Sequence, residues 1–275
     1  IKKLEKDFHI YLILVYGSFS NFQMRVNQRE LTLEGVSWEE YRIPSKPKFE
    51  LRFYDEDIAY IYKRMFMPLK DFMLFIDSAF TAISEKEINY LIIDNLGGGG
   101  LTDLADSLMS YFTEKPYRMM ERKKTKVSRM TEGFIKEKLY KGKLQDGWFI
   151  QEFPLQQSQR EIRFTGTTYI LTGTLSYSTA TCFPAAAKHF KNAVIVGEES
   201  GQPLVSNGDP NAFILPNTGL MCITALSTVC MPGHNNDRVT GVLPDHCIEP
   251  TLEDLLYEKD YILQYTLQLI REDKL

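Results

Sequence analysis

The segment Leu91-Ile92-Ile93-Asp94-Asn95-Leu96-Gly97-Gly98-Gly99-Gly100 decides the fold of this chain. Its first residues continue the apolar run NYLIID (89–94), which is typical of a strand buried in a parallel sheet. Glycine has no Cβ, so the glycine run lets backbone amides approach a ligand closely. The next segment, LTDLADSLMSYF (101–112), has apolar residues at helical spacing. A strand, a glycine turn and an amphipathic helix in this order indicate an α/β domain of βαβ type.

The same rhythm extends in both directions along the chain. Helices are expected at 67–86, 178–190 and near the C-terminus, and strands at 167–173 and 192–200. The segment NAFILPNTGLMCITALST (211–228) predicts two strands joined as a hairpin. Residues 115–162 are charged and weakly periodic, and we expect an insertion there that covers one edge of the sheet.

Two domains are expected. Residues 1–50 read as a small β-rich N-terminal segment, with strand patterns at 8–16, 21–26 and 30–36. Residues 51–275 would form the α/β core. The chain starts without an initiator Met, so we expect the N-terminal segment to be truncated and the true N-terminus to lie upstream.

Composition and charge exclude several classes of protein. Hydrophobic residues make up 44% and charged residues 25%, which is an ordinary globular balance. The net charge of −4 gives no electrostatic footprint for nucleic acid, and the basic run at 118–129 has the character of a solvated face. No apolar stretch approaches the roughly 20 residues of a membrane span. We therefore expect no nucleic-acid partner and no membrane span.

The four cysteines do not indicate a metal site. Cys182, Cys222, Cys230 and Cys247 show neither CxxC spacing nor paired histidines, so we expect no metal and no cofactor. Cys222 and Cys230 could face each other across a hairpin and form a disulfide. The favoured interpretation is that the cysteines are buried free thiols on apolar strands.

Two spots in the predicted core have a form suited to acyl transfer. The glycine run could serve as an oxyanion hole, or it could be only a tight connection from strand to helix. It matches neither GxGxxG nor GxxxxGK(S/T), so nucleotide binding is disfavoured. The second spot is LTGTLSYSTAT (171–181), where a serine would lie at the start of a helix and at the carboxyl edge of the sheet. Ser176 or Ser178 could equally be a simple helix N-cap.

Five segments in order resemble the catalytic core of peptidase family S41, which contains the C-terminal processing proteases and the tricorn core. They are DEDIAYIYKRMF (55–66), YLIIDNLGGGG (90–100), FTGTTYILTGTLSYSTAT (164–181), NAVIVGEESG (192–201), and LPNTGL (215–220) followed by GVLPDHCIEPT (241–251). Residues 8–27 are similar to the region before this core in bacterial tricorn-like members. The resemblance implies a ClpP/crotonase-like α/β fold, in which helices flank a β-sheet, preceded by the small β-rich segment.

The resemblance also implies roles for single residues. In the family, the nucleophilic serine precedes the Glu of the VGE strand by 20 positions, and Ser178 stands 20 positions before Glu198. Ser178 is therefore the nucleophile candidate. The oxyanion hole would comprise the backbone amide of Thr179 and one amide from the glycine pair Gly99 and Gly100.

The sequence departs from the family where a general base is expected. Dyad members carry a lysine in the region occupied here by SGQP (200–203), and a Glu where this chain has Thr181. Tricorn-like members use a histidine from before the core and a late glutamate, for which only Asp237 could substitute as the acid. None of His9, His189, His234 and His246 matches the position of the family's base. The base is therefore expected upstream of residue 1, or it is absent.

Two functions follow as alternatives. The first is a tricorn-like serine endopeptidase that hydrolyses peptides or unfolded proteins through an acyl-enzyme. The second is a catalytically inactive S41 homologue that binds peptides as an added strand. The resemblance further implies a bacterial, extracytoplasmic location, as a periplasmic protein or a secreted protein or lipoprotein. Substrate and oligomeric state stay open.

Overall fold

The computed structural model describes residues 21–26, 29–34, 47–251, 253–254 and 260–274. The chain divides into two compact units, residues 1–47 and 48–275. In the first unit, β1 (Asn21–Val26) and β2 (Arg29–Glu34) pair as an antiparallel hairpin. These strands correspond to the patterns expected at 21–26 and 30–36. The strand expected at 8–16 lies outside the described residues.

The second unit is built on a six-stranded sheet with the order β15-β12-β10-β5-β4-β3. Neighbouring strands are parallel throughout, except that β3 runs antiparallel to β4. The strands are β3 (Phe49–Tyr54), β4 (Ile58–Lys63), β5 (Tyr90–Asp94), β10 (Thr167–Thr172), β12 (Val194–Gly197) and β15 (His246–Cys247).

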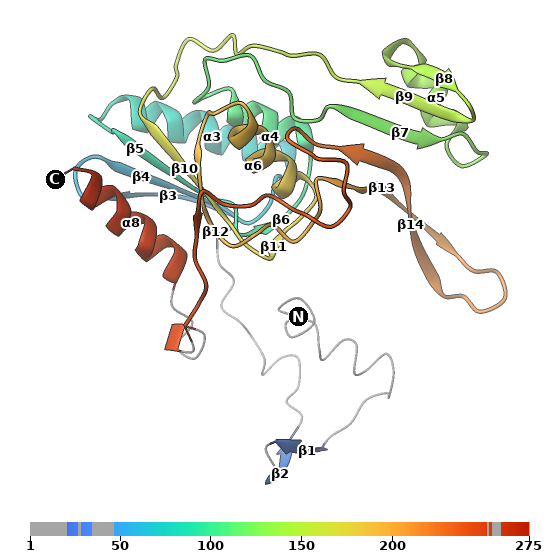
Figure 1. The fold of residues 1–275 in the computed structure, drawn as a ribbon, viewed down its shortest axis with the longest axis horizontal. Coiled ribbons are helices and arrows are strands. Elements are labelled where there is room, and N and C mark those ends of the chain that lie inside the picture. The colour runs from blue at the N-terminus through green and yellow to red at the C-terminus, as the bar shows by residue number, and fades with distance from the viewer. Residues whose placement is uncertain (1–20, 27–28, 35–46, 252, 255–259, 275) are drawn as a thin grey trace. The chain divides into compact units, whose positions relative to one another are not determined.

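Helices cover both faces of this sheet (Figure 1). The helices α3 (Leu69–Ser84), α4 (Thr102–Met109) and α6 (Thr179–His189) pack on one face, and α8 (Tyr261–Asp273) packs on the other. Along β5, Leu91 and Ile93 join the first core, whereas Ile92 joins the second. Both faces of the strand are thus buried, which explains its continuous apolar run. The prediction of an α/β core with a helix-flanked sheet is confirmed.

The insertion differs from its prediction. Residues 115–162 do not cover an edge of the six-stranded sheet but supply three strands of a second, five-stranded antiparallel sheet with the order β13-β14-β7-β9-β8. The strands are β7 (Arg122–Lys126), β8 (Lys143–Gln145), β9 (Trp148–Glu152), β13 (Val205–Ile214) and β14 (Met221–Cys230), with α5 (Glu132–Lys138) and the 3-10 helix η1 (Leu139–Lys141) between β7 and β8. The strand β7 pairs with β9 and also with the distant β14, and this second pairing could not be read from local periodicity.

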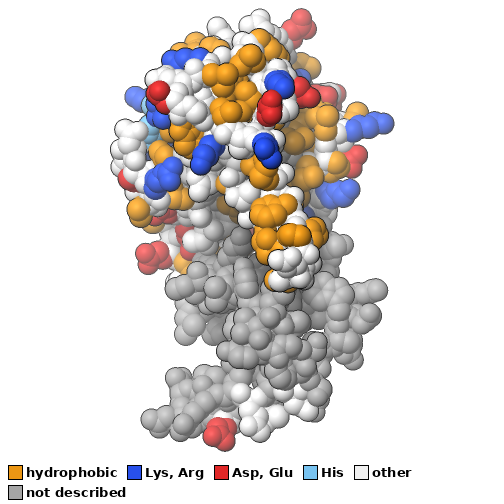
Figure 2. Space-filling view, turned by 90° about the vertical axis from the view of Figure 1, so that its right-hand side faces the viewer, with side chains coloured by type: hydrophobic (Ala, Val, Ile, Leu, Met, Phe, Trp, Pro, Cys, Tyr) orange, Lys and Arg blue, Asp and Glu red, His pale blue; other side chains and the backbone are white. Residues whose placement is uncertain are grey.

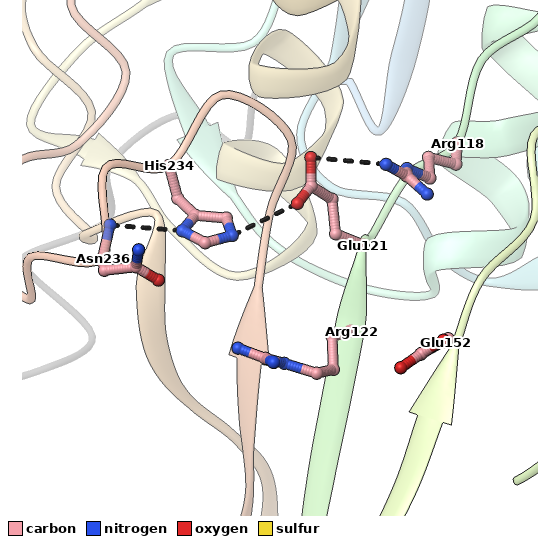
Figure 3. Close-up of a pocket in the computed structure, with 6 residues that line it drawn as sticks. All are labelled: Arg118, Glu121, Arg122, Glu152, His234 and Asn236. Carbon is pink, nitrogen blue, oxygen red and sulfur yellow. Dashed lines mark hydrogen bonds and ion pairs between the residues drawn. The ribbon is translucent and has the colours of Figure 1, made fainter.

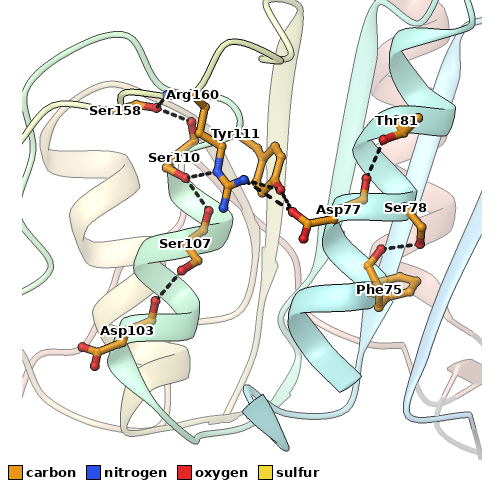
Figure 4. Close-up of polar contacts among 10 residues, drawn as sticks. All are labelled: Phe75, Asp77, Ser78, Thr81, Asp103, Ser107, Ser110, Tyr111, Ser158 and Arg160. Carbon is orange, nitrogen blue, oxygen red and sulfur yellow. Dashed lines mark hydrogen bonds and ion pairs between the residues drawn. The ribbon is translucent and has the colours of Figure 1, made fainter. Parts of the chain in front are cut away.

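A polar clasp fastens the end of the insertion to the core (Figure 4). The hydroxyl of Tyr111 donates to Asp77 on α3, and the Arg160 guanidinium lies 3.8 Å from the centroid of the Tyr111 ring. Arg160 Nε also donates to Ser110 Oγ over 2.9 Å. Burial raises the pKa of Tyr111 to about 12, so this phenol is protonated and can donate at neutral pH. The clasp therefore joins α3, the segment after α4 and the end of the insertion.

The β13–β14 hairpin, predicted from the sequence, carries an exposed apolar surface. Residues 210–236 contain no Asp, Glu, Lys or Arg. Ile214, Leu220, Met221 and Ile223 are each more than 60% exposed. Figure 2, viewed from the side on which the hairpin projects, shows hydrophobic side chains gathered there.

The cysteines are all free thiols. A disulfide between Cys222 and Cys230 was considered from the sequence, and the structure contradicts it. Both residues lie on β14, eight positions apart, and a strand rises about 3.4 Å per residue, so their Cα atoms are separated by about 27 Å. A disulfide needs Cα atoms within about 7 Å. Cys182 and Cys230 are buried as expected, whereas Cys222 is half-buried and Cys247 is exposed.

One buried charge stands out in the described core. Lys63 on β4 is 1% exposed, and its Nζ has no hydrogen-bond partner. The Nζ lies 3.9 Å from the centroid of the Phe66 ring. Burial lowers the pKa of Lys63 from 10.5 to about 7, while the nearby Asp94 carboxylate opposes this shift. Lys63 therefore makes the stability of the fold depend on pH.

We expect Lys63→Met to raise the free energy of unfolding at pH 7. Between about pH 7 and 10.5, unfolded Lys63 holds a proton that the folded state releases, so the stability of the wild type rises with pH across that range. Methionine fits a similar space without a charge, so the variant should lose this part of the rise. Urea unfolding of both proteins at pH 7 and pH 9 gives the change in free energy of unfolding with pH for each protein. Subtracting one change from the other cancels the contributions of the other titrating groups. A variant less stable than the wild type at pH 7 would contradict the prediction.

Candidate active site

The two candidate segments leave the sheet side by side. The parallel neighbours β5 and β10 pair up to Leu171 and Asp94, so both strands end at the same carboxyl edge. Just beyond, Gly97–Gly98 (β6) and Leu175–Ser176 (β11) form a two-residue parallel ladder. The glycine run and the serine loop are therefore held against each other, although they are far apart in sequence.

Ser178 lies directly before α6 in an unusual backbone conformation. Its φ is 56° and its ψ is −127°, and its side chain is exposed. A non-glycine residue in such a region stores roughly 1–3 kcal/mol, and strained residues of this kind gather at active sites. Ser178 occupies the N-cap position, but its side chain makes no capping hydrogen bond. The simple N-cap interpretation therefore does not explain Ser178.

Ser176 has a different environment. Its side chain is fully buried, and its Oγ donates to the carbonyl of Asn95 over 2.5 Å and accepts from the amide of Gly173 over 3.1 Å. Thr181 Oγ1 also donates to the Ser176 carbonyl over 3.0 Å. Ser176 thus has a structural role in the loop.

Gly99 is the glycine nearest to Ser178. A Cβ added at Gly99 would lie 3.1 Å from Ser178 Cβ and 3.6 Å from Ser178 Oγ. A Cβ added at Gly100, where φ is +129°, would instead meet the carbonyl oxygen of Phe66 at 2.4 Å. Gly99 is required because a side chain there would crowd Ser178. Gly100 is required because its φ is positive and because a side chain there would collide with the backbone of Phe66.

Three backbone amides at this edge are available to a ligand. Within the described part of the chain, the amides of Thr179, Gly99 and Gly100 donate to no acceptor. Thr179 also fixes the two segments together, because its Oγ1 donates to the carbonyl of Gly100 over 2.6 Å. Free amides at the N-terminus of α6 favour a negatively charged oxygen nearby.

Asn95 forms hydrogen bonds that hold the serine loop (residues 171–181) in place. It is fully buried, and its Nδ2 donates to the carbonyl of Ala180 in the first turn of α6 over 2.7 Å. Its carbonyl accepts from Ser176 Oγ, and its amide donates to the carbonyl of Leu171 over 3.1 Å. The Asn95 Oδ1 is buried and has no partner. The pattern NYLIIDN gave no sign of this role, which depends on contacts across 85 positions of sequence.

The histidines of the described residues lie away from Ser178. His234 Nε2 lies 3.2 Å from a carboxylate oxygen of Glu121, in a pocket of about 370 Å³ that Ser178 does not line (Figure 3). His189 is exposed at the end of α6, and His246 lies in β15 beside Tyr265. His9 falls outside the described residues. Within those residues, Ser178 Oγ makes no hydrogen bond to any group, a base included.

The carboxylate of Asp237 is engaged by its own loop. It accepts from the amides of Thr240 and Val239 over 2.8 and 2.9 Å, and from Thr240 Oγ1 over 2.9 Å. These bonds, first of all that from the Thr240 amide, hold the pKa of Asp237 far below its usual range. Asp237 is therefore ionised at neutral pH, as an acid that orients a histidine would be.

No ligand set for a metal emerges from the described residues, where no group of three His, Cys, Asp or Glu side chains could hold an ion. Within the same residues, no helix has the length and apolar character needed to cross a bilayer.

The comparisons with known proteins agree with this architecture. Residues 57–248, more than half of the chain, match the model of peptidase family S41. The chain therefore belongs to peptidase family S41. No curated protein matches it.

Several solved structures share the fold. A peptidase from Parabacteroides merdae is 21% identical with a TM-score of 0.57, over 81% of this chain and 64% of that chain. Mature CPAF is 15% identical with a TM-score of 0.60, over 92% of this chain and 67% of that chain. The photosystem II D1 C-terminal processing protease is 12% identical with a TM-score of 0.51, over 82% and 52%. The chain thus spans between about half and two thirds of these proteins, and at such identities the likeness shows the fold alone.

Proposed function

We propose that this chain is the core of a tricorn-like serine endopeptidase with Ser178 as its nucleophile. The observation that carries the proposal is the position of Ser178 at the start of α6: it is exposed and strained, its Oγ makes no hydrogen bond within the described residues, and Gly99 lies against it. A base would remove the Oγ proton as Oγ attacks the carbonyl carbon of the scissile bond. The amides of Thr179 and of Gly99 or Gly100 would donate to the tetrahedral oxyanion. The leaving amine would take the proton, and water would then hydrolyse the acyl-enzyme.

The proposed base is a histidine supplied by a part of the complete protein outside the described residues, with Asp237 as the candidate acid. In the complete protein, the imidazole would come within about 3.2 Å of Ser178 Oγ, or bridge to it through one water. A histidine base predicts that the reactivity of Ser178 rises with pH through a pKa near 6.5. The family resemblance further supports peptides or unfolded proteins as substrates and a bacterial extracytoplasmic location.

The alternative function is a catalytically inactive homologue that binds peptides. It is favoured by one observation, the absence of any base bonded to Ser178 within the described residues. A fluorophosphonate probe separates the two functions, because covalent labelling requires an activated serine. The probe should label the full-length protein on Ser178, faster at pH 8 than at pH 5. If it labels no serine, while an extended peptide still binds, the alternative holds.

A further inference from the structure

Gln202 is fixed beside the candidate nucleophile. It lies in the loop between β12 and β13, where the amide of the preceding Gly201 donates to the Ser176 carbonyl over 2.9 Å. Gly201 passes so close to the serine loop that an added Cβ would lie 2.0 Å from the Thr174 carbonyl oxygen. The following residue is Pro203, which restricts the backbone of Gln202 to extended conformations. The backbone of Gln202 therefore has little freedom relative to the serine loop.

The Gln202 side chain is held at both ends of its carboxamide. Its Oε1 accepts from the backbone amide of Ser178. Its Nε2 donates to Ser206 Oγ over 2.7 Å and to the carbonyl of Asn207 over 3.4 Å. Because the Asn207 carbonyl can only accept, Nε2 must face β13 and Oε1 must face Ser178. The orientation of the carboxamide is thus determined by its neighbours.

We propose that Gln202 is a positioning residue that sets the direction of the Ser178 side chain. The φ angle of a residue relates the direction of its N–H to the direction of its Cβ, and Gln202 holds this N–H. The carbonyl of Ser178 is held by the amides of Thr181 and Cys182, over 2.8 and 3.1 Å. With both ends of the residue bound, Ser178 stays at its φ of 56°, and its Oγ stays beside Gly99.

A second consequence concerns the oxyanion. The amide of Ser178 is occupied by Gln202 and cannot serve a substrate. Within the described residues, the amides of Thr179, Gly99 and Gly100 at this edge remain without an acceptor. Gln202 therefore also decides which amides face the reacting carbonyl.

The inference rests on the proposed function, and two readouts in the full-length protein test it separately. Gln202→Met keeps the length of the side chain and removes the acceptor, whereas Gln202→Glu keeps an acceptor. Gln268→Met, at an exposed position on α8, is the matched control. The first readout is the rate of Ser178 labelling by a fluorophosphonate, and the second is the hydrogen exchange of the Ser178 amide.

We expect Gln202→Met to slow the maximal labelling rate about tenfold or more, because a small misplacement of a reacting atom is costly, with little change in the probe's binding constant. Its Ser178 amide should exchange faster than in the wild type. Gln268→Met should stay near the wild type in both readouts. Gln202→Glu keeps the acceptor for the Ser178 amide but loses the donor to Ser206 and Asn207, so it should show smaller changes than Gln202→Met. If Gln202→Met does not fold, Ser206→Ala, which removes one anchor of the carboxamide, should show the same two changes to a smaller degree.

The outcomes distinguish the two ideas. If the wild type is not labelled at all, the proposed peptidase function fails, and amide exchange alone decides the role of Gln202. Wild-type labelling together with wild-type exchange of the Ser178 amide in Gln202→Met would overturn the positioning role. An equal loss of labelling in Gln202→Met and Gln202→Glu, without faster exchange in either, would also overturn it.

Discussion

Ser178→Ala is expected to abolish both fluorophosphonate labelling and peptide hydrolysis while leaving the free energy of unfolding within about 0.5 kcal/mol of the wild type. The Oγ is exposed and makes no hydrogen bond within the described residues, so its removal leaves no buried group without a partner. The backbone conformation that places the hydroxyl is held by main-chain bonds and by Gln202, which the variant keeps. Labelling assays and urea unfolding of the same preparations measure both effects.

Ser176→Ala is the matched control in the same loop. Its hydroxyl is buried between the carbonyl of Asn95 and the amide of Gly173. Removing it leaves both groups unsatisfied, which should cost about 1–3 kcal/mol of stability. The folded variant should still be labelled at Ser178. If Ser178→Ala remains active and Ser176→Ala does not, the assignment of the nucleophile is wrong.

Gly99→Ala is expected to lower the rate of labelling and of turnover by about 100-fold. The new methyl group would lie 3.1 Å from Ser178 Cβ and 3.3 Å from the carbonyl oxygen of Tyr177, closer than ordinary contacts. Either the serine or the Gly99 amide must then move, and both belong to the proposed site. Labelling kinetics of the folded variant measure the loss.

Gly97→Ala provides a control within the same glycine run, because a Cβ there would meet nothing within 4 Å. It should be labelled at nearly the wild-type rate. Gly100 is a poor choice for this test, since a Cβ at that position collides with the Phe66 backbone and would disturb folding first. Equal kinetics for Gly99→Ala and Gly97→Ala would remove the glycine loop from the mechanism.

The order of strands and helices in the core could be predicted because each element has a local sequence pattern that indicates its type. A continuous apolar run predicted β5, and apolar residues at helical spacing predicted α3. A run of small residues predicted α6. The choice of Ser178 as the nucleophile candidate came from the family resemblance, in which its spacing to Glu198 is the guide. The strained backbone of Ser178 and its closeness to Gly99 result from tertiary packing, so they could not be predicted from the spacing.

The features that sequence patterns missed all depend on distant partners. The charged strand β7 pairs with β14 across about 100 positions, so the expectation that the insertion covers an edge of the main sheet was wrong. Lys63 lies in an apolar core, where its type predicts a surface position. In the sequence, the stretch SGQP showed only that a lysine is missing, whereas Gln202 in fact accepts a hydrogen bond from the Ser178 amide. In each case the deciding contact joins segments that a local reading treats separately.

The joining of the glycine run to the serine loop has a consequence for synthesis of the chain. Gly99 meets Ser178, and Asn95 binds Ala180, so the site needs two segments that leave the ribosome about 80 residues apart. Translation adds about 5–20 residues per second, so the glycine loop exists for several seconds before the serine is made. The serine in turn reaches its conformation only after the loop carrying Gln202 has followed. A nascent or prematurely terminated chain that ends before this loop therefore lacks these contacts, and the proposed site is assembled only after most of this unit has been synthesised.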